Sequence, residues 1–408
     1  MASHLQSADS LSPSDIEQLI ADRRDFHAHP ELGYNEQRTA GLVAERLDEL
    51  GYEVTRKVGR TGVVGLLRGT KAASEADSAA NGEAARGLLY RADMDALPVQ
   101  EENPVAYRSQ NDGIMHACGH DAHTAIALAV AKRMAASSHE FRGHLKFAFQ
   151  PAEEGGNGAL AMIEDGVLAS PEITAAIGLH VWNNFPSGSL GVYAGPMMAA
   201  VDEFALVIEG RGGHGAMPQQ TIDAVVVAAQ LVTALQTIVS RNISPLDAAV
   251  VTVGKITGGT AFNIIAGTAE MRGTVRTFSK ETHARIPELF ERVVRGVSEA
   301  MGASYTLDYK RQTPPLVNNA EVCELVADCA ADVVGRDQVI RDDSVRTMGG
   351  EDMSYFLERV PGCYFFLGTR NEARGLTHPH HSPRFDIDES ALAAGVEIMT
   401  RIIKRYLA

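Results

Sequence analysis

The chain contains five short stretches that are rich in histidine, cysteine and carboxylate side chains. They are RADMDALP (91–98), MHACGHDAH (115–123), QPAEEGG (150–156), GLH (178–180) and PHHSP (379–383). These stretches follow predicted strands, or lie on loops that could meet at one sheet edge. In open α/β sheets, sites form at the carboxyl ends of the strands. We therefore expect the five stretches to come together.

The stretch 115–123 favours metal binding most strongly. It holds Cys118, three imidazoles and Asp121 within nine residues. Thiolate and imidazole are ligands that suit a borderline metal such as zinc. Gly119 lets the backbone bend so that Cys118 and His120 can face one centre. A solvated polar loop is the alternative, but cysteine is rarely placed in one.

Two adjacent carboxylates, Glu153 and Glu154, follow a buried strand pattern. One could ligate a metal while the other activates a metal-bound water. Taken alone, these and the remaining stretches each have an ordinary explanation. The carboxylates, including those of 91–98, could lie on surface turns, His180 could be structural, and 379–383 could be an exposed loop.

Taken together, the stretches supply cysteine, histidine and glutamate ligands in a number that points to two ions. One tetrahedral ion that keeps an open position takes three protein ligands. Two ions that share a water polarise a carbonyl group and generate hydroxide near neutral pH. The predicted chemistry is therefore metal-assisted hydrolysis.

The composition is that of a globular protein in a reducing compartment. The 408 residues are 45% hydrophobic and 22% charged, which predicts two or three domains. A net charge of −15 disfavours nucleic acid and anionic membranes as partners. The cysteines Cys118, Cys323, Cys329 and Cys363 form no disulfide framework. The N-terminus has no signal-peptide pattern and no apolar run reaches about 18 residues, so we expect a cytoplasmic protein.

Strand and helix patterns alternate over much of the chain and predict an α/β fold. A large catalytic domain, with a mostly parallel central sheet flanked by helices, is expected over 13–195 and 313–408. The intervening residues 196–312 combine long helices with alternating strands. They predict a small α+β domain inserted into the large one.

Two local predictions concern the first part of the chain. Residues 1–12 resemble a disordered lead-in, and Ser14 with Glu17 forms a capping box for the first helix. Residues 71–85 are rich in Ala, Ser, Glu and Asp without an apolar period. We expect them to be a solvated loop that lengthens a hairpin.

Longer motifs, spread from residue 26 to residue 386, resemble a known enzyme group. They are FHAHPELGYNE, RADMDALP, MHACGHDAHTA, PAEEGGNGA, GLH, GRGGHGAMP, GGTAFNII, GTVRTF, MGGEDMSYF and HHSPRFD. Their combination is similar to the aminoacylase, hippurate hydrolase and indole-acetyl-amino-acid hydrolase group. That group belongs to the aminoacylase–carboxypeptidase clan of dimetal metallopeptidases.

The resemblance implies a set of metal ligands and a general base. The implied ligands are Cys118, His120, Glu154, His180 and His381. Glu153 is implied as the general base and later proton donor. Asp95 would hold a ligating histidine in position, as carboxylates behind metal ligands do. His381 is preferred to His380 because the family places a histidine directly before the Ser-Pro step.

The resemblance also implies roles for the inserted domain, as a ferredoxin-like lid and dimerisation domain. His214 would stabilise the tetrahedral oxyanion, often across a dimer interface. Asn263 and Arg276 could bind the substrate carboxylate, for which arginine offers a bidentate fork. A salt bridge on the strand face explains Arg276 equally well, and His214 could be merely exposed.

The chain departs from the family pattern at two places outside the implied ligand set. Relatives often carry histidine where Gln219 stands, and proline where Ala266 stands. Neither position is a metal ligand, so hydrolysis is still expected. Gln219 leaves the preferred substrate open.

The predicted function is metal-dependent cleavage of the amide bond of N-acyl amino acids, such as N-acetyl or N-benzoyl conjugates. We expect two divalent ions per subunit, zinc, manganese, nickel or cobalt, and a homodimer or higher homo-oligomer. The alternative is a dipeptidase or carboxypeptidase acting on short peptides. A non-catalytic scaffold would be expected to have lost Glu153 or a ligand, yet the set is complete.

Overall fold

The computed structural model describes residues 11–71 and 86–408, and the chain divides into two compact units. Unit 1 comprises Met1–Gly195, Val317–Val345 and Tyr355–Ala408, and unit 2 comprises Pro196–Leu316 and Arg346–Ser354. The predicted lead-in at 1–12 and the predicted loop at 71–85 fall almost wholly outside the described residues.

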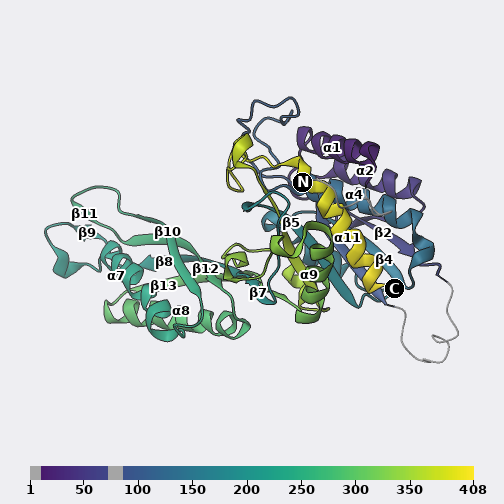
Figure 1. Cartoon of the computed structure of the whole chain (residues 1–408). Helices are drawn as coiled ribbons and strands as arrows, with labels where there is room; N and C mark the ends of the chain where they lie inside the picture. The colour runs from purple at the N-terminus through teal and green to yellow at the C-terminus, as the bar shows by residue number, and fades with distance from the viewer. Residues whose placement is uncertain (1–10, 72–85) are drawn as a thin grey trace. The chain divides into compact units, whose positions relative to one another are not determined.

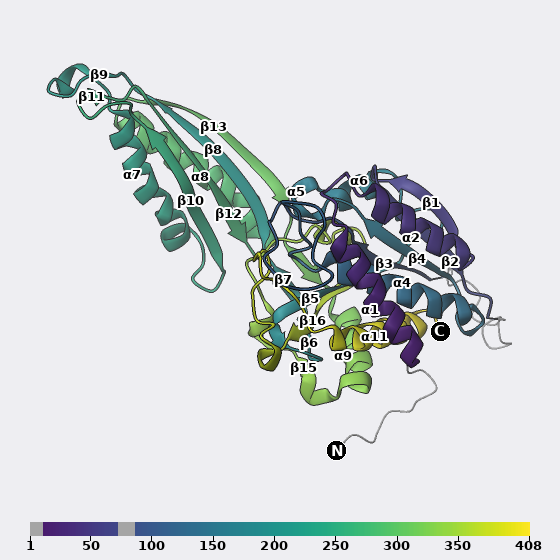
Figure 2. The ribbon, with the colours of Figure 1, turned by 90° about the horizontal axis from the view of Figure 1, so that it is seen from above.

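Unit 1 is built on an eight-stranded sheet with the order β1-β2-β4-β3-β5-β16-β6-β15. Its strands are labelled between Figures 1 and 2. The strands are β1 (Glu53–Val58), β2 (Gly62–Arg68), β3 (Gly87–Asp93), β4 (His144–Gln150), β5 (Ala175–Pro186), β6 (Leu190–Gly191), β15 (Val339–Ile340) and β16 (Gly362–Arg370). The four central strands β4, β3, β5 and β16 run parallel. They are buried on both faces, as parallel strands covered by helices are. The predicted α/β fold with a mostly parallel central sheet is confirmed.

The helices of unit 1 pack with this sheet in one hydrophobic core. They are α1 (Pro13–Ala28), α2 (Gln37–Glu49), α4 (His120–Ala136), α5 (Glu153–Gly156), α6 (Gly158–Glu164), α9 (Ala320–Val334) and α11 (Leu392–Tyr406), with α10 (Ser354–Leu357) at a boundary of the units. Helix α4 is rich in alanine and contacts both α1 and α11. Its first residue is His120, so a rigid core element begins within the predicted ligand loop.

Two local predictions are wrong. The N-cap of α1 is Ser12 rather than Ser14, because Pro13 takes the first helical position, where a missing N–H costs nothing. The side chain of Ser12 accepts the N–H of Asp15. The strands on either side of 71–85 do not form a hairpin, because β4 lies between β2 and β3 and pairs with both.

Unit 2 is a four-stranded antiparallel sheet of order β10-β12-β8-β13, with two helices on one face (Figures 1 and 2). Its main elements are β8 (Ala200–Glu209), α7 (Ala224–Thr237), β10 (Ala249–Gly258), β12 (Thr268–Thr277), α8 (Lys280–Ala300) and β13 (Ser304–Thr313). The short strands β9 (Gly213–His214) and β11 (Ile264–Ile265) pair with each other. The chain passes between the units at β7 (Gly195–Met198) and β14 (Leu316–Asn318). Burial alternates along β8 because helices cover only one face.

One described helical stretch is long and apolar enough to cross a membrane. It runs over Ala224–Asn242, which includes α7, and 33% of its most apolar window is buried. Length and composition alone give this result, and a core helix passes the same test. Leu231 and Leu235 of this stretch pack in the core of unit 2.

Asp223 caps α7, because its carboxylate accepts the N–H groups of Val225 at 3.0 Å and Val226 at 3.2 Å. Replacing it by alanine removes both acceptors. We expect the free energy of unfolding of Asp223→Ala to fall by about 1 kcal/mol, measured by urea denaturation. Asp223→Asn keeps an acceptor and should stay within a few tenths of wild type. An equal loss in both variants would contradict the capping role.

Candidate metal centre

The predicted site residues of unit 1 gather where its parallel strands end. Strand β3 ends at Asp93, two residues before Asp95, and the parallel β4 ends at Gln150, three residues before Glu153. Helix α4 starts beside them at His120. The sheet therefore brings side chains from separate parts of the sequence to one edge.

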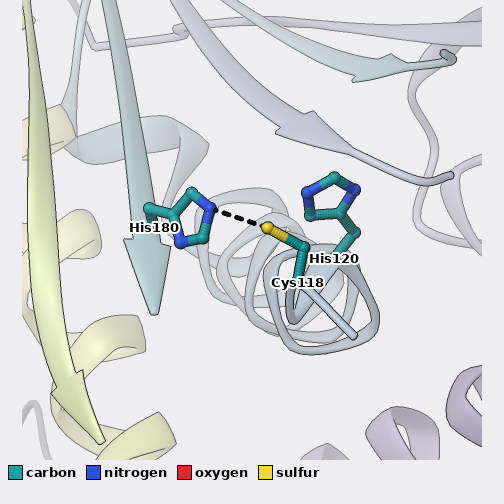
Figure 3. Close-up of side chains that lie close together, drawn as sticks. All are labelled: Cys118, His120 and His180. Carbon is teal, nitrogen blue, oxygen red and sulfur yellow. Dashed lines mark hydrogen bonds between the residues drawn. The ribbon is translucent and has the colours of Figure 1, made fainter. Parts of the chain in front are cut away.

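Cys118, His120 and His180 form a buried cluster (Figure 3). The Sγ atom of Cys118 lies 3.5 Å from Nε2 of His180. Nδ1 of His180 lies 2.6 Å from the carbonyl oxygen of Val181, to which it donates, so Nε2 faces the thiol without a proton. His180 lies within β5 rather than at its end as predicted, because pairing with β16 extends the strand to Pro186.

The imidazole of His120 has one nitrogen held and the other available. Nδ1 lies 2.8 Å from the carbonyl oxygen of Asp95, while the buried Nε2 has no hydrogen-bond partner among the described residues. Burial lowers the pKa of His120, but Asp93, Asp95 and Glu154 outweigh it and raise the pKa to about 10. The surroundings of Nε2 therefore favour a positive charge, which a metal ion would supply.

Glu154 connects this cluster to two further predicted residues. Its Oε1 lies 3.2 Å from Nε2 of His381. Potential ligand atoms of Cys118, Glu154 and His381 all lie within 4.8 Å of one another, as do those of His120, Glu153 and Glu154. The groups overlap, so one thiol, three imidazoles and two carboxylates face a common centre. This donor set fits borderline divalent cations, and its size fits more than one ion.

The two neighbouring histidines of the last stretch lie in different surroundings. His380 is buried, and its ring stacks on Trp182 with the centroids 4.6 Å apart. Its Nε2 accepts the N–H of Asn183 at 3.3 Å, and burial lowers its pKa to about 3. His381 is the one that faces Glu154.

His123 and Asp93 lie beside the cluster but are committed to other contacts. Nδ1 of His123 lies 2.6 Å from Oδ1 of Asp93, and Nε2 accepts the N–H of Val181 at 2.9 Å. Since both ring nitrogens are used, His123 orients the strand that carries His180 rather than binding a metal. Arg91 pairs with Asp93 at 2.6 Å. The ion pair of Arg91 with Asp93 was not predicted, although both residues stand just before Asp95 in the stretch 91–98.

The thiol of Cys118 is neutral unless a cation lies beside it. Burial, followed by Glu154, Glu153 and Asp93, raises its pKa well above the usual value. Thiolate is the form that binds metal, so binding releases a proton and metal affinity rises with pH.

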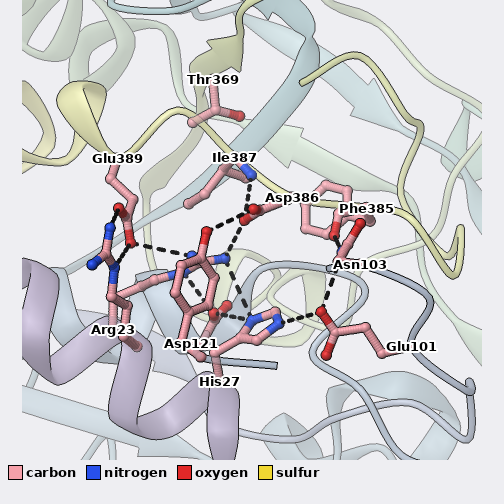
Figure 4. A network of polar contacts seen from close by, with 12 residues as sticks. Arg23, His27, Glu101, Asn103, Asp121, Thr369, Phe385, Asp386, Ile387 and Glu389 are labelled. Carbon is pink, nitrogen blue, oxygen red and sulfur yellow. Dashed lines mark hydrogen bonds and ion pairs between the residues drawn. The ribbon is translucent and has the colours of Figure 1, made fainter. Parts of the chain in front are cut away.

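A buried ionic network connects α1 to the first turn of α4 and to the loop after His381 (Figure 4). The guanidinium of Arg23 reaches three carboxylates, Asp121 at 2.9 Å, Asp386 at 2.8 Å and Glu389 at 3.2 Å. His27, one helical turn later, contacts Asp121 at 2.8 Å. Asp121 follows a cluster histidine directly, and Asp386 lies on the loop after the histidine pair. The sequence did not predict this network, because charged residues in a first helix were expected to lie on its solvent-exposed face.

In unit 2, the structure brings His214 and Asn263 together through the pairing of β9 with β11. The N–H of Gly215 donates to the carbonyl of Asn263 at 2.8 Å. The N–H of Ala216 donates to Nδ1 of His214 at 3.0 Å, so the neutral ring carries its proton on Nε2. His214 is exposed and can donate a hydrogen bond from Nε2.

Arg276 lies on β12, away from that pair. Its half-buried guanidinium has no carboxylate within ion-pair distance among the described residues, so the salt bridge that could have explained it is absent there. Burial lowers its pKa. Arg276 lies eight residues after Thr268, which starts β12, and His214 and Asn263 lie beyond that start. At about 3.3 Å per residue, Arg276 is roughly 26 Å from the start of the strand.

Comparison with known proteins identifies the family. The model of peptidase family M20/M25/M40 matches residues 89–405. The chain belongs to this family.

Similar proteins match nearly the whole length of the chain. N-acetyl-L-cysteine deacetylase of Bacillus subtilis is 39% identical over 390 residues, 96% of this chain and 88% of that protein. Thermostable carboxypeptidase 2 of Saccharolobus solfataricus is 38% identical over 381 residues, 92% of each chain. The solved structure of the YXEP protein of Bacillus subtilis, a dinuclear metal binding peptidase from the M20 family, has a TM-score of 0.82 and 32% identity, covering 97% of this chain and 99% of that chain.

Membership of the M20 family confirms the resemblance stated from the motifs. The chain is a hydrolase that acts on amide bonds and uses a divalent metal. The buried thiol and imidazoles of Cys118, His120 and His180 and the neighbouring Glu153 and Glu154, with a His120 Nε2 that makes no hydrogen bond among the described residues, fit such a cofactor.

Gly119 separates Cys118 from His120 at φ +93°, and a Cβ there would lie 2.3 Å from Cγ2 of Val181. We expect Gly119→Ala to displace the two neighbouring side chains and to weaken zinc binding at least about tenfold, measured by competition with a chromogenic chelator. Gly166→Ala is the control, because Gly166 has φ +85° but nothing within 4 Å of an added Cβ. Wild-type zinc affinity in Gly119→Ala would contradict this interpretation.

Proposed function

We propose that this protein is a dimetal amidohydrolase that cleaves N-acyl amino acids to a carboxylate and a free amino acid. The observation that supports this most directly is the buried cluster in unit 1. We assign as ligands the residues whose donor atoms meet there, Cys118, His120, Glu154, His180 and His381. The substrate class is supported by the 39% identity to N-acetyl-L-cysteine deacetylase, which is matched over 88% of its length.

The assigned ligands would hold two ions per subunit, which would supply Lewis-acid chemistry for the scissile carbonyl and for the attacking water. Glu153, beside Glu154 in the cluster, takes the proton of that water and returns it to the departing amine. Asp95 fixes the ring of His120, because its carbonyl oxygen binds Nδ1 and leaves Nε2 facing the centre. Thiol and imidazole donors favour zinc, manganese, nickel or cobalt over hard cations.

In this proposal, residues of unit 2 bind the substrate and stabilise the oxyanion. Arg276 forms no ion pair among the described residues, although Glu203 and Asp202 are near enough to act on its pKa, and its guanidinium is suited to the substrate carboxylate. His214 donates from Nε2 to the oxyanion, and Asn263 lies next to it. Because Arg276 lies roughly 26 Å along β12 from that end, one copy of unit 2 cannot present His214 and Arg276 to the same small substrate.

The separation supports a homodimer in which each active centre receives His214 from the other subunit. Strand β10 is an edge of the unit 2 sheet, so its outer N–H and C=O groups can pair with a second copy. Apolar side chains are exposed on α7, on β10, on the loop before β11 and on β11 itself; they are Val225, Val226, Val250, Ile256, Phe262 and Ile264. A second copy would cover this apolar surface, and unit 2 would serve as the dimerisation domain and lid.

A cytoplasmic location is part of the proposal. All four cysteines are free and buried, and the Sγ atoms of Cys323 and Cys363 lie 3.4 Å apart without a bond. Unbonded cysteines fit a reducing compartment.

The carboxypeptidase of Saccharolobus solfataricus keeps a second candidate open, the hydrolysis of short peptides. Both candidates use the same centre and differ in the group on the acyl side of the bond. A substrate panel separates them.

The proposed reaction is tested with metal-free protein reloaded with Zn²⁺ or Mn²⁺ and given N-acetyl, N-benzoyl and indole-acetyl amino acids, with dipeptides alongside. We expect metal-dependent release of the amino acid, and a loss of kcat of about 10³-fold in Glu153→Ala with bound metal unchanged. Exposed Glu102→Ala should behave as wild type. Cleavage of dipeptides alone would favour the peptidase, and an active Glu153→Ala would refute its role as base.

The shared centre is tested by mixing two inactive variants, Glu153→Ala and His214→Ala. In a mixed dimer, the subunit with intact Glu153 receives His214 from its partner, so we expect the mixture to gain activity that neither variant has alone. Subunit exchange is verified by mass spectrometry of the mixed species, and each variant is exchanged with itself as a control. Mixed dimers without activity would contradict the use of His214 across the interface.

A further inference from the structure

The loop that carries Glu153 has an unfavourable backbone conformation. Ala152 has φ +49° and ψ +48°, and Asn157, five residues later, has φ +54°. Left-handed backbone is disfavoured for any residue with a Cβ and persists only where the surroundings hold it. Something outside the loop must therefore fix the residue that directly precedes Glu153.

Glu36, the last residue of the FHAHPELGYNE motif, provides this hold. Its side chain is fully buried. Its Oε1 accepts the N–H of Ala152 at 2.9 Å, and its Oε2 accepts the hydroxyl of Thr61 at 2.6 Å. The two contacts fix the plane of the carboxylate. Without Glu36, the N–H of the strained Ala152 would lose this acceptor in a buried position.

A second carboxylate holds the other side of Glu153. The N–H of Glu154 donates to Oδ2 of Asp95 at 3.0 Å. The carboxylates of Glu36 and Asp95 thus accept the backbone N–H groups of the residues directly before and directly after the proposed base. Asp95 also contacts His120, whereas the Glu36 carboxylate forms its hydrogen bonds with Ala152 and Thr61. A change at Glu36 therefore acts on the base without disturbing a histidine of the cluster.

We propose that Glu36 is a positioning residue that sets the placement of Glu153 through the amide of Ala152. This inference rests on the proposed role of Glu153 as general base. The hydrogen bonds of the Glu36 carboxylate go to Ala152 and Thr61 and not to the residues assigned as ligands, so a change at Glu36 should alter the rate of proton transfer and not substrate affinity or metal content.

The test compares Glu36→Ala with Glu36→Gln in the zinc-loaded protein. Glu36→Ala should lower kcat by about 10²-fold, because a small displacement of a reacting group lowers the rate by about this factor. KM and bound zinc should stay within twofold of wild type. Glu36→Gln should keep most of kcat, since its carbonyl can accept from Ala152 and its amide can donate to Oγ1 of Thr61.

Glu31→Ala is the matched control from the same segment. The carboxylate of Glu31 accepts the N–H groups of Arg38 at 3.0 Å and Thr39 at 2.8 Å, at the start of α2. Its loss destabilises a neighbouring element without touching the loop of Glu153. We expect kcat of Glu31→Ala to stay within twofold of wild type.

A second readout does not depend on activity. Amide hydrogen exchange at Ala152 in the metal-free protein should speed up at least about tenfold in Glu36→Ala and stay slow in Glu36→Gln and Glu31→Ala. If Glu36→Ala does not fold, Thr61→Val replaces it. That variant removes one of the two contacts of the carboxylate and should also speed exchange at Ala152.

Unchanged exchange at Ala152, or a folded Glu36→Ala with wild-type kcat, would overturn the inference. So would a loss of kcat that Glu31→Ala shares or that follows a loss of zinc. Glu153→Ala, measured in the same series, separates the proposed base from the proposed positioning residue. If Glu153→Ala retains activity, the assignment of Glu153 as base is wrong. If Glu153→Ala is inactive while Glu36→Ala is fully active, only the positioning role of Glu36 is refuted.

Discussion

Buried negative charge is the constraint around which unit 1 is arranged. Asp93 and Asp121 lie in the interior and each faces a buried arginine, Arg91 for the first and Arg23 for the second. An unpaired carboxylate in such surroundings would be strongly destabilising. The carboxylates around the thiol of Cys118 face a common centre instead, where a divalent cation balances them. The same electrostatic rule thus explains both the permanent ion pairs and the affinity of the centre for metal.

The parallel sheet turns that constraint into a defined geometry. Neighbouring strands end at one edge, and helix α4 starts there with His120 as its first residue. The ionic network of Arg23 then fixes α4 to the loop that follows His381. The loops that carry the site residues are therefore fixed both by the hydrophobic core and by buried ion pairs. Their conformations need not depend on a bound ligand alone.

The sequence predicted the parts of this arrangement that short-range patterns encode. Cys118 and His120 lie two residues apart, and strand patterns precede Asp95 and Glu153, so their meeting at a sheet edge could be inferred. The order of strands could not, because periodicity does not say that β4 lies between β2 and β3. The contact of Glu36 with Ala152 spans 116 positions and joins residue types that carry no signal of it.

The thiol of Cys118 has a consequence for which ions can compete in a cell. Magnesium and calcium are abundant, but both are hard cations that prefer shells made of oxygen. A sulfur donor at the centre penalises them and rewards scarcer, softer metals. With Cys118 as a ligand, as proposed, the centre would also bind thiophilic toxic metals such as cadmium. Selectivity against the common cations would then be obtained at the risk of inhibition by rare ones.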